Sequence, residues 1–206
     1  GETNLSYFSQ AVGLAVQNFL SPAVGIAVAF ALLRGLASSD GGKLGNFFVD
    51  VVRAVLYVLL PLSLVLALVG VWQGSPQTFQ GYEMVQLLEP VSVDAEGTLV
   101  DADDPTAVQE VTEAVVPLGP QSSQVAIKQL GTNGGGFNGA NSASALENPT
   151  PLTNLLQCAA MPLIPFALIF AFGRMVGDRR QSRALMTVVL AILAAGLFSV
   201  IAAETA

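Results

Sequence analysis

Four apolar stretches limit how this chain can fold more than any other feature of its sequence. They cover residues 5–33, 54–72, 151–173 and 184–203, and none of them contains a charged side chain. A helix of about 20 apolar residues is long enough to cross the roughly 30 Å hydrocarbon layer of a bilayer. The chain is 52% apolar and only 11% charged, which lies outside the usual range of soluble domains. We therefore expect an all-α integral membrane protein that crosses the bilayer several times.

The basic residues between these stretches predict which loops face the cytoplasm. Arg34 and Lys43 lie between the first two stretches, and four arginines at 174–183 lie between the last two. Loops rich in lysine and arginine stay on the cytoplasmic side of a membrane. The segment 73–120 would then face the outside, with Lys128 as the only basic residue on that side.

The outer segment 73–120 is acidic, and it has the turn signals and short alternating runs of a small, partly extended cap. Nine carboxylates lie in it, at positions 83, 89, 94, 96, 101, 103, 104, 110 and 113. Such a cluster could attract cations toward a pore, and it is also typical of an ordinary solvated loop. The sequence leaves both interpretations open.

The composition disfavours several kinds of catalytic site. Histidine is absent and Cys158 is the only cysteine, so a zinc, haem or Cys–His site is not expected. Gly134, Gly136 and Gly139 satisfy the spacing G-x-G-x-x-G, but the strand, helix and acidic residue of a dinucleotide fold are missing around them. We expect no ATP or other nucleotide on this chain, and no nucleic-acid partner.

A glycine-rich segment carries the most specific functional signal. Residues 122–130 could form about two helical turns, too short to cross a bilayer but suited to a re-entrant pore helix. Three consecutive glycines at 134–136 then permit backbone conformations with positive φ. Rings of backbone carbonyls replace the water around a potassium ion in channels. A potassium filter is the functional interpretation, and a flexible glycine loop between helices is the alternative.

Residues 131–154 contain a string that few proteins carry. It reads Gly131-Thr132-Asn133-Gly134-Gly135-Gly136-Phe137, then Ala140-Asn141-Ser142-Ala143, then Glu147-Asn148-Pro149-Thr150-Pro151-Leu152-Thr153-Asn154. This string resembles a pore-loop signature of the potassium-binding (A) subunit family of the Kdp-type potassium-transporting ATPases. The likeness extends to residues 5–10, 16–20, 57–63, 72–74 and 177–181.

The resemblance implies membrane-pore loop-membrane repeats, the architecture of a superfamily of potassium channels and transporters. Residues 1–45 would hold the closing transmembrane helix of one repeat and a cytoplasmic loop, 46–182 a complete repeat, and 183–206 the opening transmembrane helix of the next. The parts expected within the complete repeat are a transmembrane helix at 46–72, an extracytoplasmic segment at 73–120, the pore helix and filter at 121–137, a transmembrane helix at about 149–173, and a cytoplasmic loop at 174–182. Because Gly1 is not an initiator methionine, we expect an internal fragment of a longer protein.

Carried over to this sequence, the resemblance implies that potassium is bound by the backbone carbonyls of Thr132, Asn133 and Gly134. Gly135 and Gly136 would shape the filter strand. Of these five residues, Gly134 is the one on which we expect the binding geometry to depend most, because a Cβ there would disturb the orientation of the carbonyls.

Asn141 and Glu147 are further candidate residues that would support the filter. Glu147 is the only carboxylate between Glu113 and Asp178. A carboxylate at membrane depth needs a partner, which here would be an ion or an arginine from a part of the protein outside this chain. The alternative is an interfacial glutamate that caps the following helix.

The resemblance implies a non-catalytic subunit that binds and dehydrates extracytoplasmic K+. It would deliver the ion through the membrane together with a catalytic P-type ATPase subunit and small accessory subunits, in an ATP-driven uptake complex. The phosphorylation signature Asp-Lys-Thr-Gly-Thr does not occur in the sequence, so we expect the partner to bind the ATP. The expected location is the bacterial or archaeal cytoplasmic (inner) membrane, with several spans in the lipid bilayer. The alternatives are a passive potassium channel or symporter of the same superfamily, and a structural membrane module whose glycine loop binds nothing.

Overall fold

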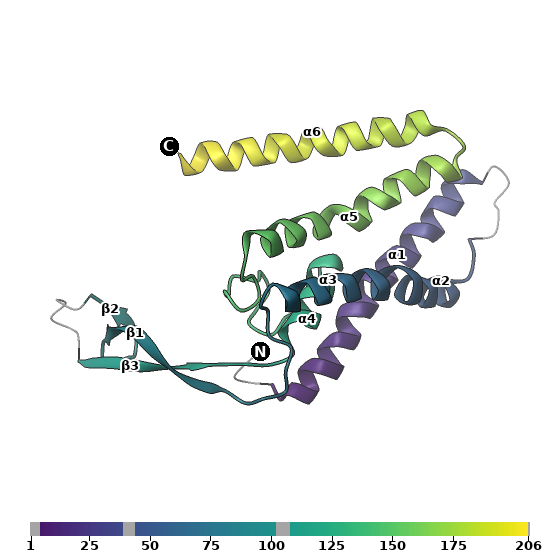
Figure 1. The fold of residues 1–206 in the computed structure, drawn as a ribbon. Coiled ribbons are helices and arrows are strands. Elements are labelled where there is room, and N and C mark those ends of the chain that lie inside the picture. Colours follow the sequence, from purple (N-terminus) through teal and green to yellow (C-terminus); the bar gives the residue numbers. More distant parts are fainter. Residues whose placement is uncertain (1–4, 39–43, 102–107, 206) are drawn as a thin grey trace.

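The computed structural model describes residues 5–38, 44–101 and 108–205. Within these ranges, four helices are long and apolar enough to cross a membrane: Ser9–Ala37, Phe47–Trp72, Pro151–Met175 and Arg179–Glu204. They cover the four apolar stretches of the sequence, and a mostly helical membrane fold is thereby confirmed. Figure 1 shows a narrow sheet projecting away from the helices.

Each of the first two spans contains a π-helical segment. The first span consists of η1 (Ser9–Leu14) and α1 (Ala15–Ala37), and the second of α2 (Phe47–Arg53), η2 (Ala54–Leu59) and α3 (Leu60–Trp72). Pro61 lies in the first turn of α3, directly after η2. A proline has no N–H to donate and its ring clashes with the preceding turn of a regular α-helix. The wider turn of η2 fits such a residue without ending the span.

An ion pair joins the first two spans at one end. Arg34 on α1 donates through Nη2 to Asp50 Oδ1 on α2 at 2.9 Å, and its Nη1 contacts the other carboxylate oxygen. The same guanidinium donates to the carbonyl of Leu44 at 2.9 Å and lies 5.7 Å from the ring centre of Phe30. These contacts fix the angle at which α2 leaves the loop after α1.

A short helix, α4 (Gln121–Leu130), is enclosed by the spans. Nine of its ten residues are buried. One core cluster joins α4 to α1 and η2, and it consists of Ile127, Leu130, Ala23, Ile26, Ala54 and Leu59. Ser122 at the start of α4 donates to the carbonyl of Ala67 in α3 at 2.8 Å. Because α4 is surrounded by protein, the non-helical backbone that follows it can lie at membrane depth.

The last two spans form a helical hairpin. α5 (Pro151–Met175) begins with a capping box, in which the side chains of Thr150 and Thr153 accept each other's backbone N–H groups at 3.2 and 3.0 Å. α6 (Arg179–Glu204) is capped by Asp178, whose carboxylate accepts from the N–H of Arg180 at 2.8 Å. Both helices extend into the range 174–182 that the sequence predicts as a loop, because these caps let α5 and α6 turn within a few residues.

A three-stranded antiparallel sheet occupies the segment predicted to face outward (Figure 1). β1 (Glu83–Val93) is the central strand and pairs with β2 (Leu99–Val100) and β3 (Gln109–Val116). The register of β1 against β3 shifts between Gln86 and Val91. The all-α expectation is therefore incomplete, because the alternating valine-rich runs of this segment satisfy their backbone groups by pairing as strands.

Candidate functional site

Residues 131–136, in which the sequence predicts the filter, follow α4 directly and are called the filter segment below. Helix α4 ends where the N–H of Gly131 donates to the carbonyl of Ile127 at 2.8 Å. Thr132 and Gly134 then have positive φ angles of 52° and 73°, while the φ of Asn133 between them is not positive. Positive φ is uncommon for a threonine, and such residues cluster at functional sites. The sign of φ therefore alternates from Thr132 to Gly134, and the glycine at 134 adopts its positive φ without the penalty of a Cβ.

The carbonyl oxygens of the predicted ligand residues are left free by the described part of the chain. No described residue donates a hydrogen bond to the carbonyl of Thr132, Asn133 or Gly134. The next carbonyl, that of Gly135, accepts from Asn18 Nδ2 at 2.8 Å. The three predicted ligand carbonyls are thus followed by a carbonyl that Asn18 occupies.

Asn18 of α1 fastens the filter segment to the first span. Its side chain donates to Gly135, and its own carbonyl accepts from Asn133 Nδ2 at 2.7 Å. Asn18 is 2% exposed, and a Cβ added at Gly135 would lie 2.5 Å from its Oδ1. A side chain at 135 would therefore displace the amide of Asn18 that contacts this backbone.

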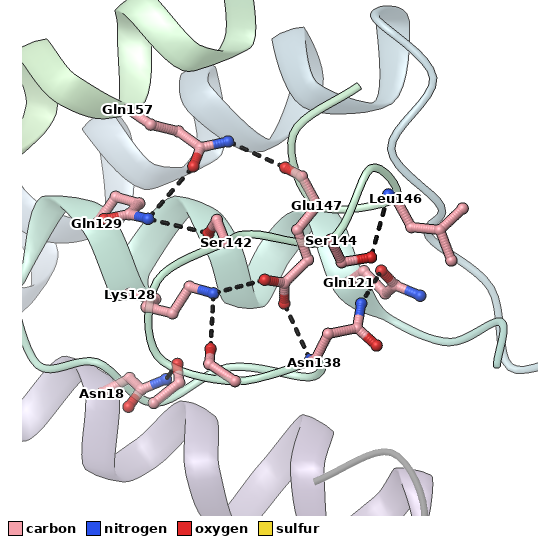
Figure 2. A network of polar contacts seen from close by, with 12 residues as sticks. Asn18, Gln121, Lys128, Gln129, Asn138, Ser142, Ser144, Leu146, Glu147 and Gln157 are labelled. Atoms are coloured by element: carbon pink, nitrogen blue, oxygen red, sulfur yellow. Dashed lines mark hydrogen bonds and ion pairs between the residues drawn. The ribbon is translucent and has the colours of Figure 1, made fainter. Parts of the chain in front are cut away.

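A buried ion pair holds the segment from the other side (Figure 2). Lys128 Nζ of α4 lies 2.7 Å from Glu147 Oε2, and both side chains are fully buried. The ammonium also donates to the carbonyl of Gly139 at 2.9 Å, while Glu147 Oε1 accepts from the N–H of Asn138 at 3.1 Å. A buried charge pair is stable only if its remaining hydrogen-bonding positions are satisfied, and the loop after the filter satisfies them here.

Further polar contacts extend this network to α5 (Figure 2). Gln157 of α5 donates to the carbonyl of Glu147 at 2.9 Å and accepts from Gln129 of α4 at 3.2 Å. Gln129 also donates to Ser142 Oγ at 2.9 Å. Hydrogen bonds of the Gln129 and Gln157 side chains therefore hold α4, the loop that contains Ser142 and Glu147, and α5 together.

The two sequence-based interpretations of Glu147 differ from what the structure shows. Thr150, and not Glu147, caps α5. The partner of Glu147 is Lys128 of the same chain, rather than an arginine from another part of the protein. Counting Lys128 only as a charge on the outer side misses this contact, because the sequence does not show that residue 128 lies on a fully buried helix.

The other side of the filter segment borders an open hollow of about 340 Å³. Thr132, Gly134 and Asn141 line it and are exposed in this chain, and Asn154 and Gln157 of α5 complete its polar wall. The structure thus brings two predicted ligand residues and Asn141 to one polar surface. Glu147 does not line this hollow and is buried behind the filter segment.

The sequence profile of the potassium-transporting ATPase A subunit family matches residues 1–206, the whole chain. The chain belongs to that family. Three curated relatives are each named potassium-transporting ATPase potassium-binding subunit. The protein of Solidesulfovibrio magneticus is 53% identical over 205 residues, covering 100% of this chain and 35% of the relative. The protein of Desulfovibrio desulfuricans is 51% identical over 204 residues, covering 99% of this chain and 33% of the relative. The protein of Clostridium botulinum is 55% identical over 185 residues, covering 90% of this chain and 30% of the relative.

Membership in the potassium-transporting ATPase A subunit family confirms the resemblance predicted from residues 131–154. Together with the four membrane-capable helices, it also confirms that the chain is a membrane protein. The chain spans about a third of the length of these curated relatives. Its site is therefore one section of a larger protein of this family.

Sequence reasoning missed three residues that hold the filter segment. Asn18 and Lys128 make the contacts described above, and Phe137 is fully buried with its ring centre 5.8 Å from that of Tyr7. One signal could have found Asn18: a polar side chain inside a span usually faces protein or a cavity rather than lipid. Phe137 belongs to the string at 131–137, but nothing in the sequence shows that its ring is buried beside Tyr7.

Proposed function

We propose that this chain is part of a potassium-binding subunit and that residues 131–136 form one section of its selectivity filter. The observation that carries this proposal is the row of free carbonyls at Thr132, Asn133 and Gly134, in a backbone with positive φ at Thr132 and Gly134. Potassium must lose its water to pass, and carbonyl oxygens supply the replacement ligands. The names of the relatives support potassium as the ion.

The described residues contribute to the transport step by positioning oxygen atoms. K+ would arrive from the outer side and exchange water for the carbonyls of Thr132, Asn133 and Gly134. Gly135 and Gly136 shape the strand, since Asn18 and Lys128 lie where their side chains would be. Asn141 would supply a polar amide at the rim of the hollow. The remaining ligands around the ion would come from the rest of the full-length protein.

The energy for transport would come from a separate subunit. The relatives are named as subunits of an ATPase, which favours an ATP-driven uptake complex over a passive channel or symporter. In that complex a catalytic P-type ATPase subunit would bind and hydrolyse ATP, and small accessory subunits would complete the assembly. The organisms of the relatives support the cytoplasmic (inner) membrane of a bacterium as the location.

A pair of glycine substitutions tests the proposed filter. Gly134 and Gly177 have nearly the same φ, 73° and 75°, and an added Cβ meets nothing closer than 3.6 Å at Gly134 and nothing within 4 Å at Gly177. Alanine at either position therefore carries a similar backbone strain, about 1–2 kcal/mol, without a steric clash. Only Gly134 belongs to the filter segment.

Both variants are made in the full-length protein within its complex, and K+-dependent ATP hydrolysis and uptake are measured in proteoliposomes. Gly134→Ala is expected to raise KM for K+ by about five- to thirtyfold, if the strain opposes the ion-binding backbone, and to weaken sodium rejection. Gly177→Ala is expected to keep the wild-type KM. If the two variants have the same KM and the same rejection of sodium, Gly134 does not belong to the filter.

A further inference from the structure

The buried ion pair Lys128–Glu147 has a feature that is not needed merely to hold the filter segment in place. An ammonium group is fully buried directly beside a segment through which a cation would pass. An ideal Cβ at Gly136 would lie 2.6 Å from Lys128 Nζ and 2.7 Å from Lys128 Cδ, so the lysine side chain runs against the filter backbone itself. A positive charge at this place would oppose binding of K+ unless another charge cancels it.

We propose that Lys128 and Glu147 are positioning residues for the filter with two separable effects. Their contacts to Gly139 and Asn138 fix the backbone after Gly136, and the carboxylate of Glu147 cancels the ammonium charge that would otherwise repel the incoming cation. This inference rests on the proposed function of residues 131–136 as a potassium filter. Neither side chain is proposed as a ligand of the ion; Lys128 lines the hollow beside Thr132 and Gly134, and Glu147 does not.

The positioning effect follows from the geometry. Lys128 lies in α4, before the filter, whereas Asn138, Gly139 and Glu147 lie after it. The pair therefore connects the two ends of the filter segment and limits how far it can move. Phe137, fully buried between these contacts, leaves the segment little room to shift.

The charge effect follows from the burial. Charges that water reaches are strongly screened, but both partners of this pair have 0% exposed side chains. Among the described residues, the other ion pair, Arg34–Asp50, joins α1 to α2 and includes no residue of α4. Glu147 is thus the described carboxylate that can cancel the charge of Lys128.

Two single substitutions distinguish the charge effect from bracing alone. Glu147→Gln keeps one oxygen that can accept from Lys128, but it leaves the ammonium charge uncancelled and replaces the acceptor for the N–H of Asn138 by an NH2 group. Lys128→Met removes the donor to both Glu147 and Gly139, which is the greater loss for a purely structural brace. Bracing alone therefore predicts the larger defect in Lys128→Met, whereas our proposal predicts the larger rise of KM for K+ in Glu147→Gln.

The variants are compared in the full-length complex by K+-dependent ATP hydrolysis and by K+ uptake in competition with Na+. We expect KM for K+ to rise about tenfold more in Glu147→Gln than in Lys128→Met. The double variant K128M/E147Q removes the uncancelled charge and is expected to restore KM to that of Lys128→Met, while its sodium rejection stays weaker than in the wild type. An equal or larger KM in Lys128→Met, or a double variant as poor as Glu147→Gln, would overturn the proposal.

The other ion pair among the described residues, Arg34–Asp50, provides the matched control. Arg34 lies 16 positions after Asn18 on the same helix, which corresponds to about 24 Å from the filter contact. Arg34→Met and Asp50→Asn are expected to lower thermal stability and to leave KM for K+ unchanged. If the complex with Glu147→Gln does not assemble, K128M/E147Q still tests the positioning role, because the double variant buries no unpaired charge. A wild-type KM and sodium rejection in K128M/E147Q would refute the positioning role.

Gly134→Ala, measured in the same assay, separates failure of this inference from failure of the proposed function. If Gly134→Ala changes KM for K+ and K128M/E147Q does not, the filter placement stands and the positioning role of the pair is wrong. If Gly134→Ala has no effect either, the filter placement itself is wrong.

Discussion

Asn18 offers the sharpest test of how the first span controls the filter. Replacing it by leucine removes one contact, the 2.8 Å hydrogen bond from Nδ2 to the carbonyl of Gly135. The contact from Asn133 to residue 18 remains, because Asn133 donates to the backbone carbonyl and not to the side chain. Leaving a buried acceptor without its donor costs about 1–3 kcal/mol. If that free energy opposes the ion-binding backbone, KM for K+ rises about five- to 150-fold.

The measurement is KM for K+ in ATP hydrolysis by the full-length complex, with Gln17→Leu as the control. Gln17 is the neighbouring residue on the same helix and is exposed in this chain, so the same chemical change there removes no described contact to the filter. We expect Asn18→Leu to raise KM and Gln17→Leu to leave it unchanged. A wild-type KM in Asn18→Leu, in a complex that assembles normally, would refute the argument that α1 holds the filter backbone.

Three further predictions concern the surroundings of the site. Phe137→Ala should destabilise the full-length protein by about 3–5 kcal/mol, since its fully buried ring leaves a cavity beside Tyr7, and thermal unfolding would measure the loss. Thr150→Ala removes the capping box of α5 and should cost about 0.5–2 kcal/mol in the same measurement, whereas Thr150→Ser should cost less. Burial, and to a smaller extent Tyr82, raises the pKa of Tyr7, whose hydroxyl donates to the carbonyl of Leu118. The stability that the neutral Tyr7 hydroxyl contributes should therefore be present below the ordinary tyrosine pKa and be lost as pH rises through the raised pKa. Ultraviolet titration of wild type and Tyr7→Phe measures this pKa. A difference between the two spectra that appears only at the ordinary tyrosine pKa would contradict the prediction.

The spans were predictable from the sequence because their signals are local, and the filter at 131–136 stays a prediction that rests on an equally local signal. The four charge-free stretches are recognised from their length and composition alone. The role predicted for Gly134 rests on its neighbours in the sequence. The strands of the outer segment were partly visible as alternating runs, but their pairing was not. The boundaries of the repeats and the sides of the membrane on which the loops lie stay predictions.

The contacts that hold the filter were not predictable, because they join residues that are distant in sequence. Asn18 and Gly135 are 117 positions apart, and no pattern in either segment names the other. Lys128 and Glu147 are 19 positions apart, yet each has another plausible role when the chain is read linearly. Only the packing of α4 between the spans shows that both charges are buried and must pair.

The central claim is that the carbonyl oxygens of Thr132, Asn133 and Gly134 bind potassium. Its most direct test is a high-resolution structure of the full-length complex in K+ and in Na+. The account predicts an ion coordinated by these three carbonyls in K+, with Gly135 still bonded to Asn18, and loss or displacement of that ion in Na+. Carbonyls that point away from every ion, or that are occupied by hydrogen bonds from the rest of the protein, would contradict it.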